Sequence, residues 1–288
     1  MSLLGKYLVI IHKFIKEVVD IMLESKIELT LDVFKVYQRL IFSETGISLD
    51  NTKISLVQSR IYKRILHYKL SSYVDYLRIL QVDNKEKMEM INLITTNETY
   101  FFREESHFNF LTKHLEHSKG KFRVWSAASS VGAEAYTVAM ILDNYLNKED
   151  WEVIGSDINS EVIKKARTGL YPLGWLSKIP DEYRKKYCLK GKGKFENQFL
   201  INRTLAKNLT FTLNNLMVEN KSFGIFDIIF LRNVLIYFNE ETKKNVVSNI
   251  LKNLKKDGYL IISLTESLQN LNIKSIEQVG SSIYQKKG

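Results

Sequence analysis

The sequence predicts an α/β protein in which a doubly wound, mostly parallel sheet follows an all-helical N-terminal domain. Residues 28–94 carry apolar side chains at helical spacing and show no strand pattern, whereas beyond residue 120 short apolar runs alternate with helical stretches. Strands that alternate with helices form a parallel sheet covered on both faces. With 45% apolar and 26% charged residues among 288, the chain has the composition of a folded protein.

The first 27 residues are predicted to form a helical extension that packs on the body. Charged Lys6, Lys13 and Lys16 interrupt its apolar pattern, so no stretch approaches the ~20 apolar residues that cross a bilayer. No small-residue cleavage site closes the segment, which argues against a secretion signal. The single cysteine, Cys188, excludes a disulfide framework and fits a reducing compartment. We therefore expect a cytoplasmic protein.

Residues 28–94 are predicted to be a helical domain, and residues 95–119 a linker to the domain at 120–288. Three helices are indicated by apolar residues at helical spacing: Leu31, Phe34, Val36, Tyr37, Leu40 and Ile41; Ile54, Val57, Ile61 and Ile65; and Tyr73, Tyr76, Leu77 and Leu80.

The strands of the second domain are predicted from four apolar runs: Phe122–Ala127, Trp151–Ser156, Phe226–Leu231 and Tyr259–Leu264. One helix is predicted from 133 to 146, a second follows the strand Trp151–Ser156 and continues through Arg167, and a third runs from about 240 to 254. Between them, residues 186–212 break the alternation. Two glycines flanked by short β-prone runs predict a small antiparallel insert there.

A ligand cleft is predicted where the first two strands end. The stretch WSAASSVGAEAY follows the first strand, and Asp157 ends the second, 25 residues beyond Gly132. Small residues let a ligand approach the helix N-terminus. In a doubly wound sheet, an acid at the carboxyl end of the second strand bonds ribose hydroxyls. Taken alone, the small residues are equally explained as turn formers, and Asp157 as a helix cap. With no G-x-G-x-x-G run and no P-loop lysine, a nucleoside without phosphates fits best, which points to S-adenosylmethionine.

Four blocks, taken together, resemble the CheR family of bacterial chemotaxis receptor methyltransferases. They are TTNETYFFRE (95–104), RVWSAASSVGAEAYTVAMIL (123–142), IGSDINSEVIKKARTGLY (154–171) and FDIIFLRNVLIYFNEET (226–242). The resemblance runs from about residue 28 to the C-terminus and implies a Rossmann-like methyltransferase sheet. It also implies S-adenosyl-L-methionine as cofactor, S-adenosyl-L-homocysteine as product, and receptor glutamates as methyl acceptors.

The resemblance implies specific site residues. Arg103 and Tyr237 match residues that face the reacting centre, and both can orient a carboxylate. A structural ion pair for Arg103 and a core position for Tyr237 are the alternatives. The positions that match the family's cofactor-binding residues are Asn97, Thr99, Arg103, Glu134, Asp157, Asn215, Leu216, Asn233 and Val234. No metal is expected.

The chain departs from the family pattern in two places. Ala133 and Ala135 stand where the family usually has a glutamate and a proline. Residues 263–267 (SLTES) replace a more usual turn that contains glycine and histidine. The first departure bears on the rigidity of the loop and on cofactor affinity.

The net charge of +10 favours an anionic partner. A nucleic-acid methyltransferase would share the fold, but the Asn/Asp-Pro-Pro-aromatic motif is missing, because the only prolines are Pro172 and Pro180. The second cysteine of the methylases that attack bases covalently is missing too. We therefore expect no nucleic-acid partner. A non-catalytic module that senses the cofactor or docks partners is the other alternative.

One basic stripe is a candidate docking surface. Lys53, Arg60, Arg64 and His67 follow the edge of the second helix, Lys63 lies beside them, and no acid occurs between Lys53 and Lys69. Without the resemblance, a solvated face is the better explanation of the stripe. With it, we expect Lys53, Arg60, Lys63 and Arg64 to dock the acidic cytoplasmic helices of a methyl-accepting receptor. The protein is then expected to be a monomer that meets the membrane only through that receptor.

Overall fold

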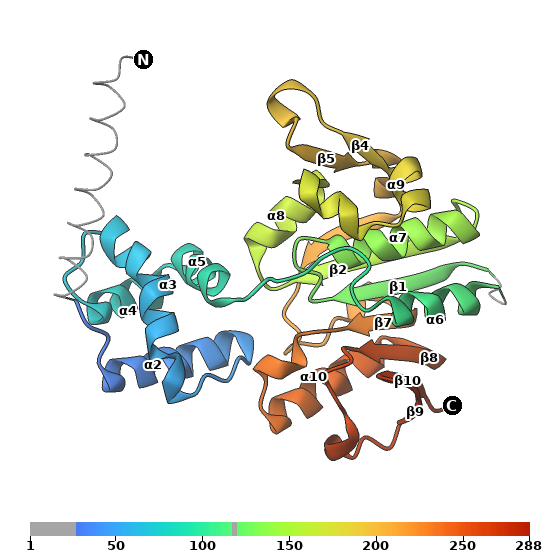
Figure 1. Cartoon of the computed structure of the whole chain (residues 1–288). Helices are drawn as coiled ribbons and strands as arrows, with labels where there is room; N and C mark the ends of the chain where they lie inside the picture. The colour runs from blue at the N-terminus through green and yellow to red at the C-terminus, as the bar shows by residue number, and fades with distance from the viewer. Residues whose placement is uncertain (1–26, 117–119) are drawn as a thin grey trace. The chain divides into compact units, whose positions relative to one another are not determined.

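The computed structural model describes residues 27–116 and 120–288 (Figure 1). Its contacts separate two units. One contains the residues up to Ser43 together with Leu49–Ile94, and the other contains Glu44–Ser48 and Thr95–Gly288. The helical extension predicted over residues 1–27 lies outside the described residues, except for Ile27.

The first unit is helical, as the sequence predicts. Its elements are α2 (Leu31–Thr45), η1 (Asn51–Lys53), α3 (Ile54–His67), α4 (Tyr73–Val82) and α5 (Asn84–Ile94). Two side chains cap helix starts: Asp50 accepts a hydrogen bond from Thr52 N, and the Ser72 hydroxyl accepts one from Asp75 N. Most of the periodic apolar residues are buried, among them Phe34, Tyr37, Ile41, Val57, Ile61, Ile65 and Tyr76.

A buried carboxylate lies among these helices. Glu86 is 3% exposed and accepts two hydrogen bonds from Arg64, both at 2.6 Å. The hydroxyls of Tyr68 and Tyr76 donate to it as well, at 2.9 and 2.5 Å. Burial alone raises the pKa of Glu86, but the bonds from Arg64 and the tyrosines outweigh it and hold the pKa below its usual value. Glu86 therefore ties α3, α4 and α5 together.

The second unit is built on a seven-stranded sheet of order β6-β2-β1-β7-β8-β10-β9. The strands are β6 (Leu209–Leu213), β2 (Trp151–Asp157), β1 (Phe122–Ala127), β7 (Phe226–Leu231), β8 (Leu254–Ile262), β10 (Ile283–Lys286) and β9 (Ile276–Gly280). The first five run parallel, which confirms the predicted sheet. The pair β10 and β9 is antiparallel and was not predicted.

Helices cover both faces of this sheet (Figure 1). On one face α6 (Glu105–Leu115), α7 (Ala133–Tyr145) and α8 (Ser160–Thr168) share a core, and on the other α10 (Glu240–Lys252) packs on β7 and β8. Nine of the thirteen residues of α7 are buried, including every residue from Ala135 to Leu142, which explains why its sequence shows little amphipathic pattern.

The antiparallel insert is a three-stranded sheet of order β3-β5-β4, with β3 at Leu170–Pro172, β4 at Cys188–Lys190 and β5 at Gln198–Ile201. It begins before residue 186, because β3 precedes helix α9 (Asp181–Tyr187). It also ends earlier than residue 212, because β6 pairs with β2 in the main sheet. Phe199 of β5 is fully buried against Tyr171 and Phe101, which joins the insert to the main body.

We predict that Glu86→Leu destabilises the helical unit by about 3–5 kcal/mol, because it leaves a mostly buried guanidinium without its carboxylate. Urea unfolding of the purified chain measures this. The matched control is Asp32→Leu, which breaks the surface pair with Lys35 and should cost less than about 1 kcal/mol. Equal costs for the two variants would contradict the importance of the buried pair.

Candidate functional site

The order of the sheet locates the site. The chain order reverses between β1 and β7, so the loops that follow β1, β2 and β7 leave the same edge of the sheet in different directions. Ligands of open α/β sheets bind at this point, beside the carboxyl ends of the strands. The predicted residues Glu134, Asp157, Asn233 and Val234 belong to these three connections.

The loop after β1 is wound tightly. Ala128, Ser130 and Gly132 all have positive φ, at 64°, 51° and 88°. A Cβ on Gly132 would meet the Phe211 ring at 2.7 Å, so both conformation and space require glycine there. Gly132 is the N-cap of α7, and the loop presents backbone N–H groups where that helix begins. This loop, residues 128–132, is called the glycine loop below.

Asp157 fixes this loop from β2. Its side chain is 7% exposed, and its carboxylate accepts from Ser130 N at 2.8 Å and from Asn159 N at 2.9 Å. Burial raises the pKa of Asp157, and these backbone bonds oppose the rise. Each carboxylate oxygen has two lone pairs, so the group retains capacity for a ligand hydroxyl. Asp157 therefore both shapes the loop and can bond a ribose.

Two buried polar atoms at this edge lack a protein partner. Within the described ranges, neither Ser129 Oγ nor Asn214 Nδ2 makes a hydrogen bond. Asn214 N donates to the Asp157 carbonyl at 2.9 Å, and Ser129 N donates to the Ser156 carbonyl at 2.7 Å. Buried polar groups are normally paired, so these two fit a polar ligand such as the nucleoside of S-adenosylmethionine. The sequence points to Asn215 and gives no signal for its neighbour Asn214.

The segment that carries Asn97, Thr99 and Arg103 lies over the loop. The Ser130 hydroxyl donates to the Asn97 carbonyl at 2.9 Å, and Phe102 N donates to Thr137 Oγ1 at 3.1 Å. The half-buried Thr99 lies between these two anchors. This segment is therefore held beside the glycine loop from both ends.

Arg103 is half-buried at the end of this segment. One of its N–H groups donates to the Glu98 carbonyl at 3.1 Å, and its guanidinium lies 5.6 Å from the centre of the Tyr100 ring. Both contacts are local. They orient the side chain without neutralising its charge.

Glu134 is held by two partners. Its carboxylate accepts from Ser126 Oγ at 2.7 Å and pairs with Arg232 Nη1 at 2.7 Å. Arg232 also pairs with Glu104, Nη2 to Oε2 at 3.2 Å, and donates to the Arg103 carbonyl. Of these three residues, only Glu134 is predicted from the sequence; Arg232 and Glu104 are not. The signal for Arg232 was a charged residue at the end of a buried strand.

Asn233 and Val234 follow β7, and Asn233 has a φ of 57°. Glu266 holds this turn by accepting from Asn233 N at 3.1 Å and from Ser263 N at 3.0 Å. Burial raises the pKa of Glu266, and the backbone bonds oppose that rise. The departure from the family pattern at 263–267 thus supplies the carboxylate that holds the turn.

Tyr237 ends the short helix η6 (Leu235–Tyr237) of the same connection. Its side chain is half-buried, and its carbonyl accepts from Ser48 N at 2.9 Å. Asn215, after β6, uses its side chain on backbone: Nδ2 donates to the Glu44 carbonyl at 2.8 Å and Oδ1 accepts from Met217 N at 3.0 Å. The next residue, Leu216, packs against the core on the α10 side.

The basic residues of η1 and α3 divide into two sets. Arg64 pairs with the buried Glu86, and Arg60 donates to the Ile94 carbonyl, so both guanidinium groups contact α5. Lys53 and Lys63 are exposed. His67 is exposed beside the Tyr68 ring, 5.0 Å between ring centres.

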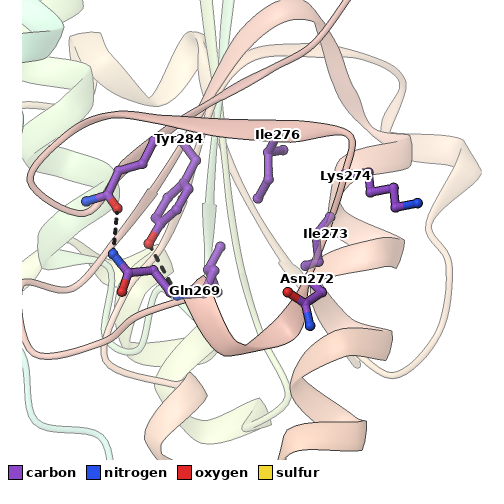
Figure 2. A pocket seen from close by; sticks show the side chains of 8 residues that line it. Gln269, Asn272, Ile273, Lys274, Ile276 and Tyr284 are labelled. Carbon is purple, nitrogen blue, oxygen red and sulfur yellow. Dashed lines mark hydrogen bonds between the residues drawn. The ribbon is translucent and has the colours of Figure 1, made fainter.

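A separate pocket of about 440 Å³ lies between η7 (Gln269–Leu271) and the antiparallel strands, as Figure 2 shows. The Tyr284 hydroxyl accepts from Leu268 N at 3.2 Å, and Gln269 donates to Gln278 at 3.2 Å. None of its lining residues is acidic. It therefore lacks a carboxylate of the kind that Asp157 supplies at the carboxyl edge of the sheet.

Over residues 27–116 and 120–288, no cluster of three or more His, Cys, Asp or Glu side chains is arranged to hold a metal ion. Across the same ranges, no helix is long and apolar enough to cross a membrane.

The sheet, the glycine loop and the acid after β2 define an S-adenosylmethionine-dependent methyltransferase. Two family models match the chain: "CheR methyltransferase, SAM binding domain" over residues 97–284 and "CheR methyltransferase, all-alpha domain" over residues 32–95. The chain belongs to the CheR methyltransferase family. This membership favours neither a nucleic-acid methyltransferase nor a non-catalytic module.

Curated relatives match most of the chain. The chemotaxis protein methyltransferase of Salmonella typhimurium is 34% identical over 87% of this chain and 88% of that protein. That of Escherichia coli is 35% identical over 83% and 85%, and that of Borreliella burgdorferi is 33% identical over 90% and 96%.

We predict a pH effect on stability from His107, which is 1% exposed in the first turns of α6. Burial, together with the charge of Arg232, lowers the pKa of His107 to about 4, against 6.5 for an ordinary histidine. Between these values the unfolded chain binds a proton that the folded chain does not, so stability falls as the pH is lowered through this window.

His107→Gln should remove this contribution, which is at most about 1.4 kcal/mol per pH unit for one proton. Chemical unfolding of both proteins at pH 4.5 to 7 measures it, and the comparison cancels the other titrating groups. Parallel stability curves for the two proteins would contradict a neutral, buried His107.

Proposed function

We propose that this protein forms glutamate methyl esters on the cytoplasmic helices of chemotaxis receptors, acting as a monomer. The observation that carries this proposal is the Arg103 guanidinium, which forms no ion pair within residues 27–116 and 120–288 and ends the segment beside the glycine loop. A cation beside the methyl donor suits an anionic acceptor. Membership of the CheR family and the names of the relatives support receptors as the source of that acceptor.

The chemistry needs little from the protein beyond placement. S-adenosylmethionine supplies a methyl group on a sulfonium, and a carboxylate attacks it in line. A glutamate has a pKa of about 4.3 and is already ionised at neutral pH, so no general base is required. The protein holds the two reactants in line and removes water from the carboxylate.

In this proposal the cofactor is held by the carboxyl edge of the sheet. Asp157 bonds the ribose hydroxyls, and Glu134 takes the methionine end. Asn97, Thr99 and Arg103 line the pocket from above the loop. The adenine and sulfonium portions are enclosed by two further segments, which contain Asn215, Leu216, Asn233 and Val234. The buried Ser129 hydroxyl and Asn214 amide supply the further polar contacts that such a ligand needs.

A labelling experiment tests the function. The protein is incubated with methyl-labelled S-adenosylmethionine and receptor-containing membranes, and the membranes are then treated with base. Methyl esters release labelled methanol, whereas methylated amines and bases do not. Label that enters the receptor and resists base would contradict ester formation, and absence of label would contradict the receptor as substrate.

We predict that Tyr237→Phe lowers turnover by about 10- to 100-fold while cofactor affinity changes little, because the lost hydroxyl bonds the charged acceptor. Arg103→Ala should act in the same direction. Turnover at saturating cofactor and calorimetric binding of S-adenosylhomocysteine separate the two effects. A Tyr237→Phe variant with native turnover would return this residue to a packing role.

We propose that the exposed basic face of α3 docks the acidic receptor helix. Because Arg60 and Arg64 also make contacts within their own unit, Lys53→Glu with Lys63→Glu is the cleaner test. This variant should methylate receptors about 10-fold more slowly at low salt and less so at high salt, where charges are screened. Cofactor binding should be unchanged.

The matched control for docking is Lys35→Glu with Lys85→Glu, which makes the same change in net charge on α2 and α5. Equal losses in the two variants would mean that net charge alone matters. Native rates for Lys53→Glu with Lys63→Glu at low salt would make this face a solvated surface.

A further inference from the structure

We infer that Arg232 is a positioning residue that couples the cofactor subsite to the placement of Arg103. Its contact with Glu134 concerns the cofactor, and its contact with Arg103 concerns the methyl acceptor, so the second half of the inference rests on the proposed function. No role for this arginine is predicted from the sequence.

The contacts of Arg232 join the end of β7 to two other segments of the chain. Nη1 pairs with Glu134 Oε2 at 2.7 Å, and Nη2 pairs with Glu104 Oε2 at 3.2 Å. Nη2 also donates to the carbonyl oxygen of Arg103. The guanidinium carbon lies 5.5 Å from the centre of the Phe108 ring. One planar group thus joins α7, the start of α6 and the end of β7.

Glu104 extends this connection to β8. It has a φ of 59°, and its carboxylate accepts from Ser263 Oγ at 2.8 Å and from Leu264 N at 3.0 Å. Burial alone raises the pKa of Glu104, but the Arg232 charge and these bonds outweigh it and lower the pKa. The neighbouring His107 is neutral at pH 7 because its pKa lies near 4. Arg232 is therefore the cation that balances the two carboxylates it contacts.

Burial makes the arrangement rigid. The Arg232 side chain is 2% exposed, and those of Glu104 and Glu134 are 14% and 13% exposed. A charge taken out of water must keep its partners, so none of the three can turn away independently. The guanidinium is planar and its donors are fixed relative to one another. A shift of Glu134 when the cofactor binds is consequently transmitted to the Arg103 backbone.

Arginine is required for this task, and lysine is not equivalent. A lysine ammonium is a compact charge on a flexible stem, and it does not have two nitrogens held in one plane, so it cannot reproduce the separate bonds of Nη1 and Nη2. Arg232→Lys therefore keeps the positive charge while it loosens the link between Glu134 and the Arg103 carbonyl. This variant separates coupling from charge.

The matched control is Arg123→Lys. Arg123 also pairs with a carboxylate, Glu152 at 2.9 Å, donates to two backbone carbonyls and lies 4.6 Å from the Phe226 ring centre. It belongs to the start of β1, at the edge opposite to the glycine loop. Both variants lose an arginine network of similar size, and only one lies at the cofactor edge.

The first experiment measures binding of S-adenosylhomocysteine and receptor methylation in both variants, with thermal unfolding as the check on folding. Arg232→Lys should weaken binding of S-adenosylhomocysteine by about 10-fold, because losing a hydrogen bond to a charged group has an effect of this size. It should also lower turnover at saturating cofactor by about 10-fold or more. Arg123→Lys should leave both within about twofold at a comparable loss of thermal stability. Equal effects of the two variants on binding and turnover would overturn the inference.

The second experiment is a double-mutant cycle on the affinity for S-adenosylhomocysteine. A merely structural role of Arg232 would produce no coupling between Arg232 and Glu134 in this affinity. Arg232→Lys and Glu134→Gln loosen the same contact, so their combination should bind the ligand no more than about twofold worse than the weaker single variant. When Arg123→Lys is combined with Glu134→Gln, their fold-changes in binding affinity should multiply. Multiplicative effects in both pairs would overturn the inference.

The binding half of the inference, through Glu134, and the coupling to Arg103 are contradicted by different results. The binding cycle uses no receptor, so it stands or falls without the proposed acceptor. If wild-type protein binds the ligand but methylates no receptor, the proposed function is wrong and the binding half of the inference is unaffected. If wild-type turnover is normal and Arg232→Lys retains it, the coupling to Arg103 is wrong while the proposed function stands.

Discussion

The structure of the site depends on one constraint: a buried carboxylate must be matched by donors that reach it. Four acids at the carboxyl edge of the sheet obey it. Asp157 accepts from Ser130 N of the glycine loop, and Glu266 accepts from Asn233 N and Ile236 N of the turn after β7. Glu104 and Glu134 share Arg232. Since an unmatched buried charge costs several kcal/mol, each acid holds the loops that supply its partners. The loops are therefore placed by charge as much as by packing.

The same constraint explains how strained backbone is retained. Ser130 and Asn233 adopt positive φ, which L-residues with a side chain rarely do. The N–H group of each donates to one of the buried acids, Asp157 in the first case and Glu266 in the second. The bond is lost if the residue relaxes. Strain of this kind persists only where the surroundings determine it, and both residues lie at the carboxyl edge of the sheet.

Local pattern in the sequence predicts the strands at 122–127 and 226–231 at their true bounds, because buried parallel strands are continuous in hydrophobicity. The same pattern does not predict Arg232 with Glu104, which lie 128 positions apart, or Glu266 with Asn233. These pairs exist only after the sheet brings strand ends together, and nothing near either partner in the chain indicates the other. The unpredicted antiparallel strands β9 and β10 are short, with too few residues to show a clear alternation.

Helix α3 shows how the choice of cation separates structural from accessible charge. Sequence spacing alone places Lys53, Arg60 and Arg64 in one basic stripe. In the structure, however, both arginines form hydrogen bonds within their own unit. Arginine suits such positions because its planar fork bonds a carboxylate in two places and is weakly hydrated. Lysine, a strongly hydrated point charge, is almost never fully buried without a partner. In a basic helix that also packs in a core, the lysines are therefore the better guide to a surface for an acidic partner. The arginines indicate where the helix is joined to its neighbours.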